Sequence, residues 1–283
     1  MTRAPASPAS PSLPADGRWR RRISRSTIGA AREFRATAAG AWGVPSSFTH
    51  RPAREDARAP RTGGPRPFLS DVGLRGRAAP PVVLVHGFAG SSASWFAVRR
   101  ALRADGRTVV SFDYLPWASS VDELADRLVE TVQDVLAATG ADKVHLVGHS
   151  LGGVIIALAL TREGLPAHVD LAVTLGSPFS GSPWAGALPL GPLVRALRPG
   201  SPLLRRLAAA PAPAGVRWLA FGSTLDPIVP ARCAVPANRP VSSVIVYAAG
   251  HCGMLLDPAV IARIVAATRP REDVADRGAA VAA

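Results

Sequence analysis

The sequence has 283 residues but only two cysteines, one lysine and no long apolar run. Two cysteines are too few for the disulfide framework of a small secreted domain. No window of about 18 uninterrupted apolar residues occurs, so we expect no transmembrane segment. The basic N-terminal part also lacks the apolar stretch of about seven residues that a cleavable signal peptide requires. These absences together predict a cytoplasmic protein.

Positive charge is concentrated in the first part of the chain. The formal net charge is +13, and residues 1–80 supply +10 of it. Lys143 is the only lysine among 33 basic residues, a bias more typical of genomic base composition than of phosphate recognition. Because no basic face interleaved with aromatic side chains accompanies the charge, we expect no nucleic acid as a partner.

Residues 1–67 are expected to form a basic, largely disordered extension, because they are rich in Pro, Ser, Ala and Arg. Within it, apolar residues recur at helical spacing over residues 23–42, beside Arg25, Arg32 and Arg35, and predict an amphipathic helix. Two interpretations stay open. Such a helix binds an anionic membrane surface, which would make the protein peripheral to the membrane. Alternatively it packs against the main domain or stays loosely ordered.

Residues 68–283 are expected to form one α/β domain. Short apolar runs bounded by Pro and Gly, typical of strands buried on both faces, alternate with segments of helical period. We expect strands at 82–85, 108–114, 144–147, 169–175, 216–221 and 243–248, and a closing helix at 258–267. The alternation predicts a mostly parallel central sheet with helices on both faces.

The strongest chemical signal is the segment 148–152, which reads Gly-His-Ser-Leu-Gly and joins a strand to a helix. A serine at the apex of such a turn presents its hydroxyl to solvent. A side chain at Gly148 or Gly152 would collide with the neighbouring strand or helix. The turn also aims the free N–H groups of the new helix at whatever the serine attacks. We therefore predict Ser150 to be a nucleophile.

A serine hydroxyl is a weak nucleophile, so it needs a base, and the base needs an acid that orients it. In this architecture the chain order is serine, acid, histidine. Between Ser150 and His251 the only acidic residues are Glu163, Asp170 and Asp226. Glu163 ends a predicted helix, and Asp170 begins a predicted strand at the wrong edge of the sheet. Asp226 follows the carboxyl end of a strand, so it is the predicted acid.

His251 is the predicted base because it lies in a glycine-flanked loop after the last strand. The only other histidine after Ser150 is His168. His168 precedes Asp226, so it breaks the required order, and we expect it to cap a surface strand.

An oxyanion needs two preorganised donors. One predicted donor is the N–H of Leu151, directly after the nucleophile, and the other is the N–H of Phe88 in the loop after the first strand. We expect His86, which with Gly87 begins that loop, to hold the loop in place. His149 is expected to pack beside the turn and to take no part in proton transfer.

These motifs together resemble the α/β-hydrolase superfamily, and within it bacterial lipases and carboxylesterases of the triacylglycerol lipase type. The motifs are His86-Gly87-Phe88, Gly148–Gly153, Gly176-Ser177-Pro178, Asp226 and Gly250-His251, and the resemblance covers residues 80–268. It implies hydrolysis of carboxylic esters through an acyl-enzyme, without a cofactor or metal. Ser150 is then the nucleophile and His251 the general base and later acid. Asp226 orients His251, while Phe88 and Leu151 bind the oxyanion.

The expected substrate is a small-molecule or lipid ester, but other reactions use the same machinery. A thioesterase, an acyltransferase or an amidase forms the same acyl-enzyme, so the sequence does not separate them. A non-catalytic module that binds a membrane or a partner would predict a broken set of catalytic residues, and this set is complete.

Two further features leave alternatives open. Residues 178–214 are rich in Leu, Pro, Gly and Ala and form either a small apolar cap or lid over the serine, or an ordinary crossover helix with a long loop. Cys233 and Cys252 lie on the loops of Asp226 and His251, where a disulfide and two buried thiols are both compatible with the sequence.

Overall fold

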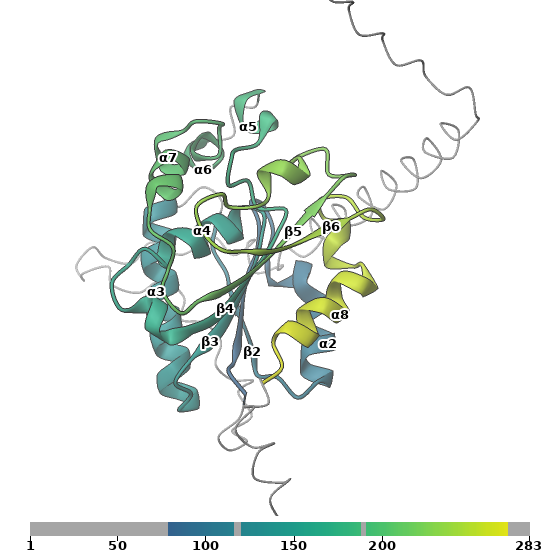
Figure 1. Ribbon diagram of the computed structural model, residues 1–283. Helices are drawn as coiled ribbons and strands as arrows, with labels where there is room; N and C mark the ends of the chain where they lie inside the picture. The colour runs from purple at the N-terminus through teal and green to yellow at the C-terminus, as the bar shows by residue number, and fades with distance from the viewer. Residues whose placement is uncertain (1–78, 116–119, 188–190, 271–283) are drawn as a thin grey trace, which may run out of the picture.

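The computed structural model describes residues 79–115, 120–187 and 191–270 (Figure 1). In these ranges the strands are β1 (Val82–Val85), β2 (Val109–Phe112), β3 (Val144–His149), β4 (Val169–Leu175), β5 (Arg217–Ser223) and β6 (Ser242–Val246). They form one sheet in the order β2-β1-β3-β4-β5-β6, and every neighbouring pair is parallel. The extension over 1–67 and its amphipathic helix at 23–42 lie outside the described residues.

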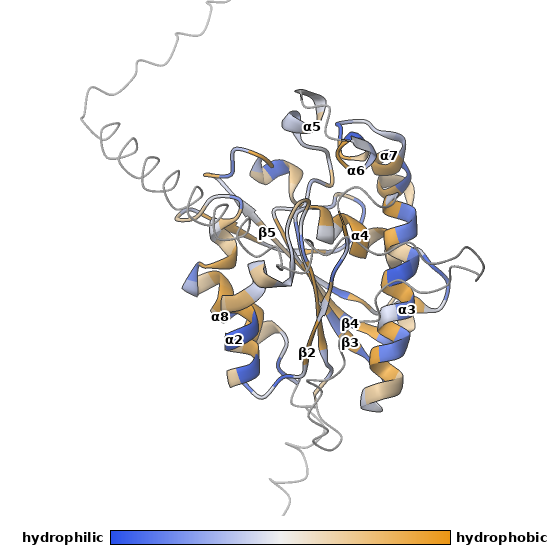
Figure 2. Cartoon of the chain, turned by 180° about the vertical axis from the view of Figure 1, so that it is seen from behind, coloured by the Kyte–Doolittle hydropathy of each residue, from blue (hydrophilic) through white to orange (hydrophobic). Residues whose placement is uncertain are grey.

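Helices cover both faces of the sheet, as the alternating pattern predicts (Figures 1 and 2). The helices are α2 (Phe96–Ala104), α3 (Val121–Thr139), α4 (Leu151–Ala159), α5 (Pro183–Ala187), α6 (Gly191–Ala196), α7 (Pro202–Ala209) and α8 (Pro258–Ala267). Helices α2 and α8 pack on one face, and α3, α4 and α7 on the other. Figure 2 shows the apolar residues on the strands and on the sides of the helices that face them.

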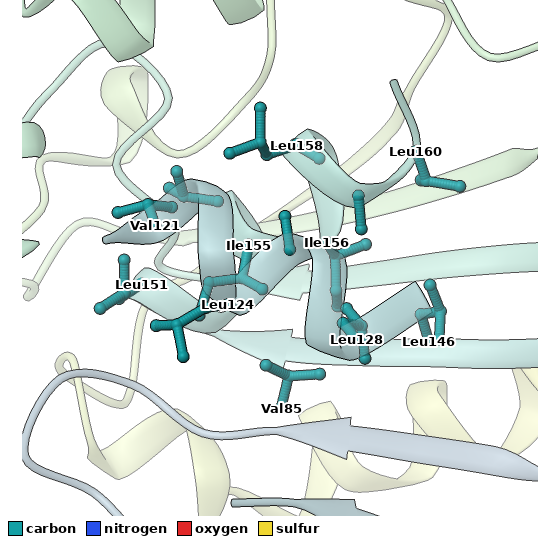
Figure 3. Close-up of a cluster of buried hydrophobic side chains, with 14 of the residues drawn as sticks. Val85, Val121, Leu124, Leu128, Leu146, Leu151, Ile155, Ile156, Leu158 and Leu160 are labelled. Atoms are coloured by element: carbon teal, nitrogen blue, oxygen red, sulfur yellow. The ribbon is translucent and has the colours of Figure 1, made fainter. Parts of the chain in front are cut away.

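Helix α4 is buried along its whole length, because it lies between the sheet and α3 (Figure 3). Its apolar side chains meet those of α3 and of strands β1 and β3 in one cluster: Val85, Val121, Leu124, Leu128, Leu146, Leu151, Ile155, Ile156, Leu158 and Leu160. A helix that is apolar all round needs cover on every side. This packing fixes the start of α4, where the predicted nucleophile lies.

Local signals set the ends of α3. The Ser120 hydroxyl accepts a hydrogen bond from the Glu123 N–H at 3.1 Å, which is one half of a capping box. Gly140 ends the helix with a φ of +65°, a conformation that costs glycine little. Strand β2 is shorter than expected, because the N–H of Tyr114 bonds to the His86 ring at 3.2 Å and so leaves the strand direction.

The described parts of the segment 178–214 contain three short helices, α5 to α7. Helix α7 buries Leu203, Leu204 and Leu207 in the core, and Arg206 forms an ion pair with Asp122 of α3 at 2.6 Å. A lid that spans the whole segment stays a prediction. Within the described ranges, no helix combines the length and the apolar content needed to cross a membrane. Cys233 and Cys252 are both partly buried and are not joined to each other by a disulfide.

Candidate active site

Ser150 lies in a strained turn between β3 and α4. Its φ of +52° and ψ of −121° fall in a region that residues with a side chain rarely occupy. The turn is attached to the end of β4, because the Ser150 N–H donates a hydrogen bond to the carbonyl oxygen of Leu175 at 2.8 Å. Strain of this kind persists only where the surrounding structure imposes it.

The glycines of the turn are required by close backbone contacts. A Cβ atom at Gly148 would lie 2.6 Å from the nitrogen of Gly153, and one at Gly152 would lie 2.1 Å from the carbonyl oxygen of Val85. Both distances are far below van der Waals contact, so the backbone would have to move. The absence of these side chains lets α4 start directly against the end of β1, with Ser150 at the apex.

The loop after β1 lies against the same turn. A Cβ atom at Gly87 would be 3.0 Å from the Cβ of Ser150 and 3.0 Å from Nδ1 of His149. Phe88 follows Gly87 directly and packs against the core as a partly buried residue. The two predicted oxyanion donors, Phe88 and Leu151, therefore come from segments that touch beside Ser150.

Asp226 and His251 form a buried hydrogen-bonded pair. Oδ2 of Asp226 lies 2.7 Å from Nδ1 of His251, and the two side chains are 0% and 5% exposed. Oδ1 of Asp226 accepts the N–H groups of Ile228 and Val229, both at 2.8 Å. Because a carboxylate oxygen only accepts, this contact assigns the proton to Nδ1 and leaves Nε2 of His251 as the basic nitrogen.

The end of β4 brings this pair to the serine. Gly176 follows the strand with a φ of +55°, and a Cβ atom there would lie 3.1 Å from both Asp226 Oδ2 and His251 Nδ1. The preceding residue, Leu175, holds the Ser150 N–H. The three predicted residues thus lie around one point at the carboxyl ends of β3, β5 and β6. Among the described residues the Ser150 hydroxyl has no hydrogen-bond partner. The hydrogen bond between a nucleophile and its base often tightens only when substrate binds.

His149 supports the backbone of the histidine loop. Its Nε2–H donates to the carbonyl oxygen of His251 at 3.0 Å, and the two rings lie 4.7 Å apart. Burial, together with the nearby charge that His251 can carry, lowers the pKa of His149 to about 3. The His149 ring therefore holds the backbone of the loop that carries His251.

His86 and Tyr114 fix the loop after β1. Nδ1–H of His86 donates to the carbonyl oxygen of Gly87 at 2.8 Å, while Nε2 accepts the Tyr114 N–H. The Tyr114 hydroxyl returns a hydrogen bond to the His86 carbonyl at 2.9 Å, and the two rings stack at 4.1 Å. Burial lowers the pKa of His86, which favours the neutral ring. Both ring nitrogens of His86 are therefore occupied in structural contacts.

Glu163, Asp170 and His168, which the sequence rejects as catalytic residues, lie away from Ser150. Asp170 pairs with Arg217 at 2.5 Å, at the amino ends of β4 and β5. Glu163 is exposed, and His168 contacts the Asp142 carbonyl at 3.3 Å on the surface. In the part of the chain that the structure describes, no three His, Cys, Asp or Glu side chains gather closely enough to hold a metal ion.

Several side chains that organise the site carry little signal in the sequence. Ser223, the last residue of β5, donates its hydroxyl to the carbonyl of Ala249 and accepts the Leu225 N–H at 3.0 Å. It thereby joins the loops of Asp226 and His251. Ser182 and Trp184, at the start of α5, donate hydrogen bonds to backbone carbonyls of the loop that carries Asp226, which we call the acid loop. A polar residue at the end of a buried strand is the one hint that could have identified Ser223.

The comparisons with known proteins agree with this fold. A family model described as the alpha/beta hydrolase fold matches residues 80–189. A triacylglycerol lipase of Pseudarthrobacter phenanthrenivorans is 34% identical over 113 residues, 37% of this chain and 35% of the relative. A triacylglycerol lipase of Burkholderia plantarii is also 34% identical over 113 residues, 37% of this chain and 31% of the relative. The match therefore spans about a third of each curated relative.

Among solved structures, the mature form of Bacillus licheniformis lipase BlEst2 has a TM-score of 0.59 to this chain at 18% identity. The similarity covers 68% of this chain and 94% of the lipase, and at this identity it shows the fold. The class is thus defined: the chain has the α/β-hydrolase fold. Its sequence over the matched stretch is similar to bacterial lipases.

Proposed function

We propose that this chain is a serine hydrolase of carboxylic esters, a lipase or esterase that works through an acyl-enzyme. The observation that carries the proposal is the buried hydrogen bond between Asp226 and His251, which lies beside the strained turn of Ser150. The similarity to triacylglycerol lipases suggests an ester as the bond that is cleaved.

In the first half of the proposed reaction, Oγ of Ser150 attacks the ester carbonyl carbon and its proton moves to Nε2 of His251. The carbonyl oxygen becomes an oxyanion. When the tetrahedral intermediate collapses, the alcohol leaves with the proton from His251, and the acyl group stays on Ser150. In the second half, His251 takes a proton from water, the hydroxide attacks the acyl carbon, and the acid leaves as Ser150 regains its proton.

Asp226 and two N–H groups stabilise the charges that develop. The Asp226 carboxylate favours the imidazolium form of His251 and keeps its ring oriented. Leu151 is the first residue of α4, so its N–H has no acceptor within the helix, and the positive end of the helix dipole adds to it. Neither this N–H nor that of Phe88 donates to any other described residue. Both are thus available for the oxyanion.

The proposed substrates are medium or long acyl esters. Trp184 and Ile228 expose apolar side chains on α5 and on the acid loop, and an apolar rim at these positions favours an acyl chain over a polar group. We also propose that residues 68–283 form the hydrolase domain with a cap within 178–214, and that residues 23–42 contact membranes peripherally. Removing residues 1–60 should then lower liposome sedimentation, and unchanged partitioning would dismiss the membrane contact.

The test compares wild type with Ser150→Ala, and with Ser180→Ala as a matched control, because Ser180 is exposed and follows β4 nearby. Each protein is incubated with a fluorophosphonate probe and with p-nitrophenyl esters of rising chain length. We expect labelling and turnover in wild type and Ser180→Ala only. Equal labelling of Ser150→Ala, or no turnover of any ester, would contradict the proposal. Thioester and amide substrates run alongside separate the alternative reactions.

A further inference from the structure

Two side chains from the start of α5 reach across to the loop that carries Asp226. The buried Ser182 hydroxyl donates to the carbonyl oxygen of Ile228 at 2.7 Å. The indole N–H of Trp184, a residue that is 51% exposed, donates to the carbonyl oxygen of Pro227 at 2.6 Å. The two contacts join segments that are 46 and 43 positions apart in the chain.

The two carbonyls belong to the same peptide groups that hold the Asp226 carboxylate. The peptide between Pro227 and Ile228 accepts from Trp184 through its oxygen and donates its N–H to Asp226 Oδ1 at 2.8 Å. The next peptide accepts from Ser182 and donates the Val229 N–H to the same oxygen at 2.8 Å. In a trans peptide, oxygen and N–H point in opposite directions. Each peptide group therefore lies in line between a residue of the α5 segment and the carboxylate.

We infer that Ser182 and Trp184 are positioning residues that hold the Asp226 carboxylate in line with His251. The inference builds on the proposed function. With both donors in place, the two peptide planes cannot rotate without losing a hydrogen bond on each side. A chain of hydrogen bonds also polarises its members, which strengthens the two N–H contacts to Oδ1. The remaining oxygen, Oδ2, is thereby aimed at Nδ1 of His251.

The α5 segment is itself attached to the end of α6, so it acts as part of a larger unit. The Ser182 N–H donates to the Leu197 carbonyl at 2.9 Å, and Nε of Arg198 donates to the Ala185 carbonyl at 2.9 Å. Gly181 lies so close to this turn that a Cβ atom there would be 2.5 Å from Cα of Pro199. A displacement of this unit would withdraw both donors from the acid loop together.

A double-mutant cycle tests the inference in the full chain. Ser182→Ala and Trp184→Phe each remove one donor, and Ser180→Ala is the matched control. We expect each of the first two to lower kcat about fivefold with little change in KM, the factor expected for loss of one hydrogen bond. In an Asp226→Asn background the same substitutions should change kcat less than about twofold, because they act through a carboxylate that is no longer present.

Rates are normalised to the fraction of folded protein measured by circular dichroism, so misfolded protein does not count. Trp184 is half exposed, so Trp184→Phe should fold even where Ser182→Ala does not. Equal fold-changes in both backgrounds, or wild-type kcat in both variants, would overturn the inference. Such a result leaves the proposed function intact as long as labelling depends on Ser150. Labelling that is independent of Ser150 would remove the proposed function first, and the inference with it.

Discussion

Nδ1 of His251 lies 2.7 Å from Oδ2 of Asp226, although the two residues belong to loops that follow different strands. Ser223 joins these loops, since its hydroxyl donates to the Ala249 carbonyl and accepts the Leu225 N–H. Both partners of the pair are nearly inaccessible to solvent. The pair is therefore formed before any substrate binds, which is the preorganisation that proton transfer in a hydrolase needs.

Replacing the carboxylate should remove most of the activity and leave the fold intact. In Asp226→Asn the amide cannot hold the His251 proton on Nδ1, so Nε2 no longer serves as the base. We expect kcat/KM for a p-nitrophenyl ester to fall about 10³- to 10⁴-fold. Circular dichroism checks the fold.

Glu163→Gln is the matched control, because Glu163 is the exposed acid between Ser150 and His251 in the chain. It should retain wild-type kinetics. A variant with the wrong histidine tautomer is expected to keep about a thousandth of the activity or less. If Asp226→Asn kept more than about a tenth of the wild-type kcat/KM, another residue would have to orient the histidine.

A methyl group at Gly152 should disrupt the turn. Its Cβ would lie 2.1 Å from the Val85 carbonyl oxygen, so the start of α4 must move away from β1. We expect Gly152→Ala to lose about 3 kcal/mol of unfolding free energy, the upper range for overpacking, and to lose fluorophosphonate labelling. Gly186→Ala is the control, since nothing lies within 4 Å of its added Cβ. A Gly152→Ala protein with wild-type stability would contradict the tight packing.

The sequence predicts the elements that bear local signals. Strands β1 and β4 and helix α8 begin and end at the expected residues, since prolines, glycines or a change of period mark their limits. The turn at Ser150 is equally readable, because its glycines are dictated by steric contacts. The contacts of Ser182 and Trp184 could not be predicted. Each joins a side chain to a backbone carbonyl more than forty positions away, and a backbone acceptor leaves no pattern in the sequence.

The buried His145 should make the fold sensitive to mild acid. Its Nε2–H donates to the Thr268 carbonyl at 3.1 Å, and its Nδ1 lies 3.5 Å from Oδ2 of Asp170 without a hydrogen bond. Burial lowers the pKa of His145, and the positive charges of Arg217 and Arg107 lower it further. These effects outweigh the attraction of Asp170, which raises the pKa, so the pKa falls from 6.5 to about 4. The unfolded chain therefore binds this proton more readily than the folded one.

Because the pKa is lowered on folding, this contribution to stability is complete above pH 6.5 and is lost as the pH falls towards 4. We expect it to amount to about 3 kcal/mol between pH 7 and pH 4. His145→Gln keeps a donor for the Thr268 carbonyl but does not titrate, so its free energy of unfolding should fall less over this range. Urea unfolding followed by tryptophan fluorescence measures both proteins. Parallel curves for the two would refute the assignment.

Tyr114 should affect catalysis through the loop that carries Phe88. Its hydroxyl donates to the His86 carbonyl at 2.9 Å in a buried position, and Tyr114→Phe leaves that carbonyl without this donor. We expect a loss of about 1–2 kcal/mol in unfolding free energy. If the Phe88 N–H binds the oxyanion, kcat should also fall about fivefold at unchanged KM. Tyr247→Phe is the control, since Tyr247 is 72% exposed. Wild-type kcat per labelled serine in Tyr114→Phe would contradict this prediction. It would show that the loop tolerates loss of the Tyr114 hydroxyl and that other contacts hold the Phe88 N–H in place.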